Sequence, residues 1–221
     1  MHYTGTIWRP PYEAESLLIQ VTAGCTHHSC KFCTLYEDLP FKFRMSPLEE
    51  IRSDLKEVKQ YYRSIDRVFF TGANPFVLSV DKLKTLAKMV HKYFPTCESI
   101  GCFARITDVS QKSVADLQEL KELGYDCITF GIETGDDEAL KFMKKGYRSK
   151  DIIEQCKKLE EVGMHYNFFY LTGISGSKRG NIGAKATAKI FNQLHPQIID
   201  ASMLTIYPTS ELYQEIQAGN W

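Results

Sequence analysis

The chain has 221 residues, of which 43% are hydrophobic, so it is long enough for one sizeable core or two small ones. Lys and Arg number 27, as do Asp and Glu, and this balance creates no overall field that would concentrate nucleic acid or an anionic membrane surface. No stretch reaches the roughly 18 apolar residues that a membrane span needs, and we expect a cytoplasmic protein.

Six apolar, β-branched runs predict buried parallel strands. They cover residues 17–21, 68–71, 99–104, 126–132, 166–171 and 198–206. Most of these runs start roughly 30 residues apart, which is the length of a βαβ unit. Because such crossovers are right-handed, six repeats curl into a partial barrel, whereas eight would close one. The sequence therefore predicts an α/β fold, a partial (β/α)6 TIM-like barrel.

Helices are predicted between the strands by apolar residues at helical spacing. One stripe comprises Leu83, Leu86, Ala87 and Val90, and another comprises Ile152, Cys156 and Leu159. Ser46 before Pro47, and Asp136, are predicted N-caps. Gly124 and Gly163 are predicted to end helices in the left-handed backbone conformation.

No linker and no low-complexity segment interrupts the chain, so we expect a single domain over residues 1–221. Residues 209–221 predict the start of one more helix. That start leaves open that the natural chain continues beyond Trp221.

Three of the seven cysteines, Cys25, Cys30 and Cys33, lie within nine positions, directly after the first predicted strand. In a parallel barrel this is the carboxyl end of the strand, where active sites form. An odd number of cysteines in a chain of this size favours reduced thiols with a metal over disulfides. Thiolates are soft ligands for iron, and three of them leave one corner of a four-iron cluster free for a substrate or cosubstrate.

The remaining cysteines lie among apolar neighbours and are expected to be small buried hydrophobes. They are Cys97, Cys102, Cys127 and Cys156.

A strand, a three-cysteine loop and alternating βα units together resemble the radical S-adenosylmethionine (SAM) superfamily over nearly the whole chain. The usual spacing in that family is C-x3-C-x2-C, and here it is C-x4-C-x2-C. The resemblance implies a 4Fe-4S cluster held by Cys25, Cys30 and Cys33, with SAM as cosubstrate. It also places the ring of Phe32 near the adenine of SAM.

The turn of Gly72, Ala73 and Asn74 stands where the family has a Gly-Gly-Glu-Pro-like turn that receives the methionyl ammonium group. Ala73 and Asn74 depart from that pattern, and a backbone contact survives such changes. An ordinary βα turn remains an alternative interpretation.

The segment from Gly131 to Gly135 resembles the family's Gly-Ile-Glu-Ser-Gly segment and implies that Glu133 contacts SAM. Lys145, with Arg148 as a substitute, is where the family has a basic residue for the methionyl carboxylate. Arg105 closes the third strand and is expected to contact the cosubstrate or the substrate, or only to pair with Asp108.

The resemblance implies reductive cleavage of SAM to a 5′-deoxyadenosyl radical that abstracts hydrogen from a substrate. We expect a small-molecule or peptide substrate and an electron donor such as flavodoxin or ferredoxin, with no membrane or nucleic-acid partner. The reaction outcome stays open among oxidation, rearrangement, methylation and ring formation.

Three alternatives remain. A zinc site would use His27 or His28 as its fourth ligand. A barrel enzyme without a cluster would bind a sugar phosphate through a loop such as residues 175–178. A non-catalytic iron–sulfur or zinc-binding protein would need no cosubstrate pocket.

Overall fold

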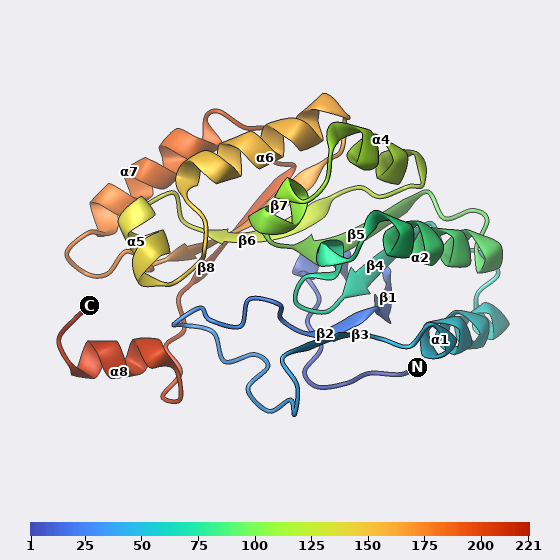
Figure 1. The fold of residues 1–221 in the computed structure, drawn as a ribbon, viewed down its shortest axis with the longest axis horizontal. Coiled ribbons are helices and arrows are strands. Elements are labelled where there is room, and N and C mark those ends of the chain that lie inside the picture. The colour runs from blue at the N-terminus through green and yellow to red at the C-terminus, as the bar shows by residue number, and fades with distance from the viewer.

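The main sheet of the protein has six parallel strands, and each strand lies beside the next one along the chain (Figure 1). The computed structural model describes residues 1–221. The strands in spatial order are β1 (Leu17–Gln20), β4 (Arg67–Thr71), β5 (Ser99–Ala104), β6 (Ile128–Glu133), β7 (Tyr166–Thr172) and β8 (Ile198–Met203). All six predicted strands are present, and the predicted partial barrel is confirmed.

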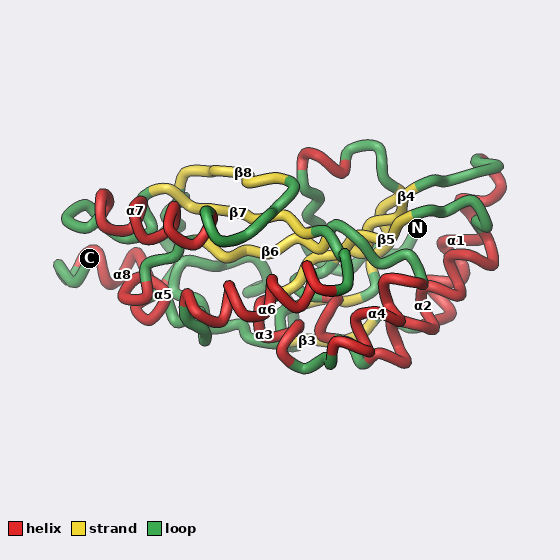
Figure 2. The backbone as a smooth tube through the Cα atoms, turned by 90° about the horizontal axis from the view of Figure 1, so that it is seen from above, coloured by secondary structure: helices red, strands yellow, loops and turns green.

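The helices between the strands cover one face of this sheet, as the view from above shows (Figure 2). They are α1 (Leu48–Tyr61), α2 (Val80–Tyr93), α3 (Ile106–Ser110), α4 (Val114–Glu122), α5 (Asp137–Phe142), α6 (Ser149–Glu161) and α7 (Gly180–Phe191). A last helix, α8 (Glu211–Gln217), follows the final strand, and 3-10 turns lie at Pro11–Glu13 and Pro75–Val77. The predicted apolar stripes of α2 and α6 are buried against the sheet. One continuous core therefore joins the helices to the strands.

The starts and ends of the helices follow the prediction in most places. Asp136 caps α5 by accepting a hydrogen bond from the backbone N–H of Glu138. Gly124 and Gly163 have φ of +91° and +66°, as expected after helix ends. The predicted start of α1 was wrong by one residue, because Pro47 rather than Ser46 occupies the cap position and the helix begins at Leu48.

Two features of the sheet differ from the prediction. The last strand, β8, was expected to be buried, but it pairs only with β7 and most of its side chains are exposed. The first strand ends at Gln20, after which β2 (Thr22–Gly24) pairs antiparallel with β3 (Phe43–Met45). This second, two-stranded sheet was not predicted, and the cysteine loop lies in the connection between its two strands.

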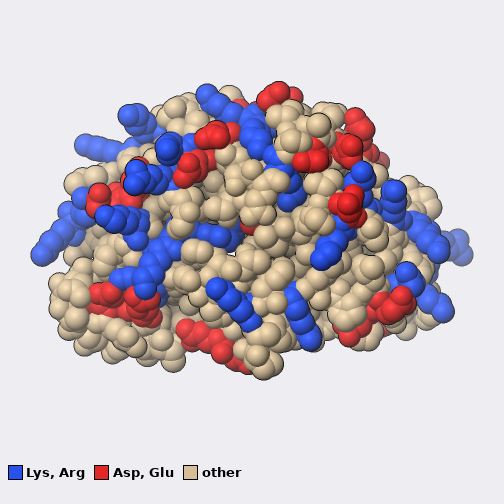
Figure 3. Space-filling model, in the orientation of Figure 1, with Lys and Arg blue, Asp and Glu red and all other residues tan.

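No helix of the protein combines the length and the apolar character needed to cross a lipid bilayer. Basic and acidic side chains are interspersed over the face in Figure 3, in agreement with the balanced charge of the sequence.

Candidate active site

A cavity of about 260 Å³ lies at the carboxyl ends of the strands. Most of its lining is apolar, and it includes every residue predicted to hold the cluster or SAM except Asn74 and Arg148. The predicted residues in the wall are Cys25, Cys30, Phe32, Cys33, Gly72, Ala73, Arg105, Glu133 and Lys145. Since parallel strands present their carboxyl ends at one edge, loops far apart in sequence meet here.

The three cysteines converge on one space. All three are free thiols, and they also line a smaller space of about 40 Å³ beside the main cavity. The loop is anchored at its start by the Cys25 N–H, which donates to the Lys42 carbonyl at 2.9 Å. At its end, the Cys33 N–H donates to the Cys30 carbonyl at 3.1 Å. These two bonds join backbone atoms only, so they do not occupy the sulfur atoms.

The surroundings of Cys30 and Cys33 favour the protonated thiol when no metal is bound. Burial raises the pKa of Cys30, and it raises the pKa of Cys33 to about 11. The ammonium of Lys145 opposes both increases. A bound metal displaces these protons, because the thiolate is the form that acts as a ligand.

Lys31, between Cys30 and Phe32, ties the loop to the end of the chain. Its N–H donates to the Met143 carbonyl at 3.2 Å, and its carbonyl accepts from the Leu212 N–H at 2.8 Å. Its ammonium pairs with Glu215 of α8 and lies 4.1 Å from the centre of the Phe142 ring. Helix α8 therefore packs directly on the cysteine loop.

This contact was missed by the sequence analysis, which treated residues 209–221 only as the start of a further helix. The signal available in the sequence was the pair Leu212 and Ile216, two apolar residues four positions apart and therefore on one face of a helix. Leu212 is fully buried with Met143 and Ile174. A short apolar face of that kind does not identify the segment against which it packs.

Glu133 and Lys145 form a buried ion pair in the cavity wall. The Lys145 ammonium is 3.0 Å from the Glu133 carboxylate, donates to the Gly131 carbonyl at 2.9 Å, and lies 5.7 Å from the centre of the Phe32 ring. Burial by itself would lower the pKa of Lys145, but the neighbouring acidic groups, with the Glu133 carboxylate foremost, together outweigh burial and raise it. Lys145 is therefore a fixed cation.

The backbone at this end of β6 has an unusual shape that aims Glu133. Glu133 has φ of +64°, and the pairing of β6 with β7 shifts register between Gly131 and Glu133. The hydroxyl of Tyr147 donates to the Gly131 carbonyl at 3.0 Å. Non-glycine residues in this backbone region are costly unless their surroundings hold them, and they cluster at functional sites. Tyr147 was not singled out from the sequence.

Gly72 lies where only glycine fits. Its φ is +129°, and a Cβ would lie 2.1 Å from the Thr22 hydroxyl oxygen and 2.4 Å from the Thr22 carbonyl oxygen. The hydroxyl oxygen of Thr22 is buried without a hydrogen-bond partner. The turn thus brings the backbone of Gly72 and Ala73 into the cavity wall with no intervening side chain.

Asn74 lies outside the cavity lining, and its side chain holds the cysteine loop in place. The side-chain N–H groups of Asn74 donate to the Thr26 hydroxyl at 2.8 Å and to the Asp108 carboxylate at 3.2 Å. Asp108 in turn accepts from the Arg105 backbone N–H at 2.8 Å. Burial raises the pKa of Asp108 to about 6. This polar network joins three of the loops at the rim.

The guanidinium of Arg105 donates to the Thr107 hydroxyl and to the Lys145 carbonyl, so its side chain does not pair with Asp108. Arg148 is exposed and lines a separate open groove with Lys141, Lys144 and Lys150. The structure therefore brings Arg105, but not Arg148, to the cavity that contains the cysteines.

The two loop histidines have different surroundings. His27 donates from its ring Nε2 to the Lys144 carbonyl, whereas His28 lines the small space shared by the three cysteines. His28 therefore remains the geometric candidate for a fourth ligand if the site binds zinc.

The donor set fits a 4Fe-4S cluster. Three convergent thiols supply soft ligands and leave one iron without a protein ligand. An apolar wall, a fixed cation beside a carboxylate, and backbone groups at a glycine turn adjoin them. Such a site can accept an amphipathic, zwitterionic cosubstrate next to the cluster.

The family model described as the radical SAM superfamily matches residues 19–182. Among curated proteins, the chain is 23% identical over 199 residues to the heme chaperone HemW of Bacillus subtilis (strain 168), covering 87% of this chain and 51% of that protein. It is 24% identical over 216 residues to the uncharacterized methyltransferase sll1242 of Synechocystis sp. (strain ATCC 27184 / PCC 6803 / Kazusa), covering 93% of this chain and 38% of that protein. The chain thus spans about half or less of the length of these relatives.

Solved structures show the same fold. The radical SAM methyltransferase TsrM from Kitasatospora setae, with cobalamin and a [4Fe-4S] cluster bound, superposes with a TM-score of 0.73 at 16% identity, covering 92% of this chain and 39% of that one. Coproporphyrinogen III oxidase (HemN) from Escherichia coli superposes with a TM-score of 0.63 at 16% identity, covering 90% of this chain and 46% of that one.

The chain belongs to the radical SAM superfamily, since the family model covers most of its length. Members of this superfamily are enzymes, and their cofactors are a 4Fe-4S cluster and SAM.

Proposed function

We propose that Cys25, Cys30 and Cys33 hold the cluster and that the chain cleaves SAM reductively to start hydrogen abstraction from a substrate. When bound, the cluster and SAM supply a one-electron cleavage of the sulfonium to methionine and a 5′-deoxyadenosyl radical. The observation that carries this proposal is the convergence of the three free thiols with the Glu133–Lys145 pair and the Gly72 turn on one cavity.

The roles of the individual side chains follow from their chemistry. The Lys145 ammonium would attract a carboxylate, while Glu133 and the backbone of Gly72 and Ala73 would accept hydrogen bonds from an ammonium group. Phe32 and the other apolar side chains in the wall would keep water from a reactive carbon radical. Arg105 would orient the Lys145 segment through its bond to the Lys145 carbonyl.

The substrate is proposed to be a small molecule or a peptide, and reduction would come from a donor such as flavodoxin or ferredoxin. A small-molecule substrate is supported by the fold similarity to TsrM, which has been solved with a tryptophan substrate. The relatives have different functions, one being named a heme chaperone and the other a methyltransferase, so the proposal stops at SAM cleavage and hydrogen abstraction.

Anaerobic reconstitution of the full chain with iron and sulfide tests the proposal. We expect about four irons and four sulfides per chain, and production of 5′-deoxyadenosine when SAM and dithionite are added. Cys30→Ala should lose the stable cluster and all SAM cleavage. Cys97→Ala is the matched control, because Cys97 is a buried cysteine far from the loop in sequence, and this variant should keep both.

Other outcomes favour the alternatives. A stable cluster without 5′-deoxyadenosine would favour a non-catalytic cluster protein. If the wild type binds zinc in place of iron and His28→Ala no longer binds that zinc, a closed Cys3His site is favoured. An intact, active cluster in Cys30→Ala would refute the ligand assignment.

A further inference from the structure

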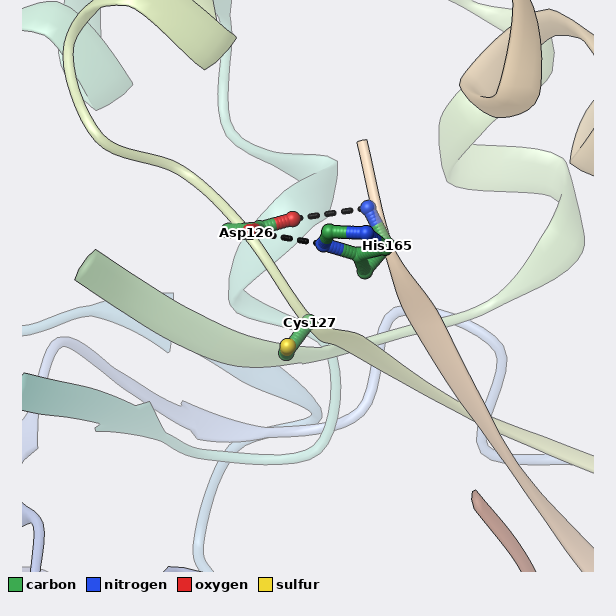
Figure 4. Close-up of side chains that lie close together, drawn as sticks. All are labelled: Asp126, Cys127 and His165. Atoms are coloured by element: carbon green, nitrogen blue, oxygen red, sulfur yellow. Dashed lines mark hydrogen bonds and ion pairs between the residues drawn. The ribbon is translucent and has the colours of Figure 1, made fainter. Parts of the chain in front are cut away.

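A second group of metal-binding side chains lies at the opposite end of the sheet from the cysteine loop. Asp126 and Cys127 precede β6, and His165 precedes β7, so all three lie at the amino ends of these strands (Figure 4). Their ligand atoms lie within 4.8 Å of one another. The expectation that Cys127 is a buried hydrophobe was wrong, because it is only partly buried, unlike Cys97, Cys102 and Cys156.

The backbone fixes the two segments that carry these side chains. The His165 N–H donates to Asp126 Oδ1 at 2.7 Å, and the Ile128 N–H donates to the His165 carbonyl at 3.0 Å. The Asp126 N–H donates to the Ile100 carbonyl at 3.0 Å. Ligands on a frame held by such bonds lose little entropy when they bind an ion.

The spacing of the ligand atoms suits a small tetrahedral ion. His165 Nδ1 lies 3.0 Å from Asp126 Oδ2, as the dashed line in Figure 4 marks. Nitrogen and oxygen ligands on one zinc ion lie about 3.3 Å apart, since each is about 2.0–2.1 Å from the metal. An ion can therefore enter between these atoms after a small displacement, and the Cys127 sulfur, within 4.8 Å of both, would be the third ligand.

One contact competes with an ion. The Lys121 ammonium lies 3.0 Å from Asp126 Oδ2. Lys121 is partly exposed on α4, so its side chain can move into solvent without disturbing the core. Half of the His165 side chain is also exposed, which gives an ion a path to the site and leaves a position for water.

We propose that Asp126, Cys127 and His165 form a zinc site, with water as the fourth ligand, that is separate from the cluster site. The combination of thiolate, imidazole and carboxylate favours zinc over magnesium or calcium, which prefer oxygen ligands alone. A zinc ion here would join the amino ends of β6 and β7. It would stabilise the barrel at the end that does not carry the active site.

The test uses the full chain with its cluster reconstituted, so that Cys25, Cys30 and Cys33 are not available to zinc. The protein is dialysed anaerobically against Zn²⁺ buffered at about 1 µM, and bound zinc and iron are then measured by mass spectrometry. We expect about one zinc per chain with the iron content unchanged. Cys127→Ser and His165→Gln should each lose most of the zinc while keeping the iron.

His195→Gln is the matched control. His195 also pairs with a carboxylate, Glu160 at 3.2 Å, but no cysteine lies with it, and this variant should bind as much zinc as the wild type. Lys121→Met should raise zinc affinity by up to about fivefold, because a surface ion pair no longer competes.

Two results would overturn the proposal. One is a wild-type protein that keeps its iron and binds no zinc under these conditions. The other is zinc binding that is equal in the wild type, Cys127→Ser and His165→Gln, which would place the ion elsewhere.

Discussion

Strand β6 has an ion pair near each of its ends, and the two pairs differ in their exposure to solvent. At the carboxyl end, Lys145 and Glu133 have side chains that are 7% and 11% exposed. At the amino end, Lys121 and Asp126 are 28% and 19% exposed, and His165, which is hydrogen-bonded to Asp126, is 50% exposed.

Paired charged side chains therefore have different effects on stability at the two ends of β6. A buried charge needs its partner, since removal of one member leaves an uncompensated charge in a poorly solvated site. A pair in contact with water is worth little, because the solvent replaces the lost partner. Lys145 and Glu133 thus form a rigid wall for the active site, whereas the amino-end side chains are free to exchange their partners for an ion.

The largest effect is expected from Lys145→Met, which leaves the Glu133 carboxylate buried without its cation. We expect a loss of about 3–5 kcal/mol in the free energy of unfolding, measured by urea denaturation under anaerobic conditions. The double variant Lys145→Met/Glu133→Gln is the control and should recover a large part of that loss. A loss below about 1 kcal/mol in the single variant would show that water reaches this pair as it reaches the amino-end pair.

An intermediate effect is expected at Asp108, at the carboxyl end, and it depends on pH. Burial raises the pKa of Asp108 from 3.8 to about 6, so the folded state binds the proton more tightly than the unfolded state. The contribution to stability is therefore full below pH 3.8 and is lost as the pH rises through about 6. A shift of this size corresponds to roughly 3 kcal/mol.

Asp108→Asn removes this titration and keeps an oxygen that can accept from the Arg105 N–H. As the pH rises from 4 to 7, the unfolding free energy of the wild type should fall relative to that of the variant. Urea denaturation at a series of pH values measures that difference. A constant difference over this range would mean that Asp108 is not desolvated in the folded protein.

The smallest effect is expected from Lys121→Met at the amino end when no metal is added. Since Lys121 and Asp126 are both partly exposed, the unfolding free energy should change by less than about 1 kcal/mol. The measurement is the same urea denaturation as for Lys145→Met. A loss comparable to that of Lys145→Met would remove the contrast between the two ends of β6.

The sequence by itself determined the class of fold and the three-cysteine motif, whose role as cluster ligands remains a proposal. Parallel strands are buried on both faces and are read as apolar runs, which is why 99–104 was predicted with the bounds of β5. The cysteines of the loop are close in sequence, so their spacing can be read without knowledge of the fold. The bounds of a single domain remain a prediction.

Only the tertiary structure decided which polar side chains face the cavity. Asn74 matches a family turn in sequence, but its amide is held by Thr26 and Asp108 from other loops. Arg148 is close to Lys145 in the chain yet faces another groove. The packing of α8 on Lys31, and the approach of His165 to Asp126 and Cys127, join residues that are far apart in sequence. Such contacts depend on the mutual placement of whole elements, which local patterns of hydrophobicity and spacing do not encode.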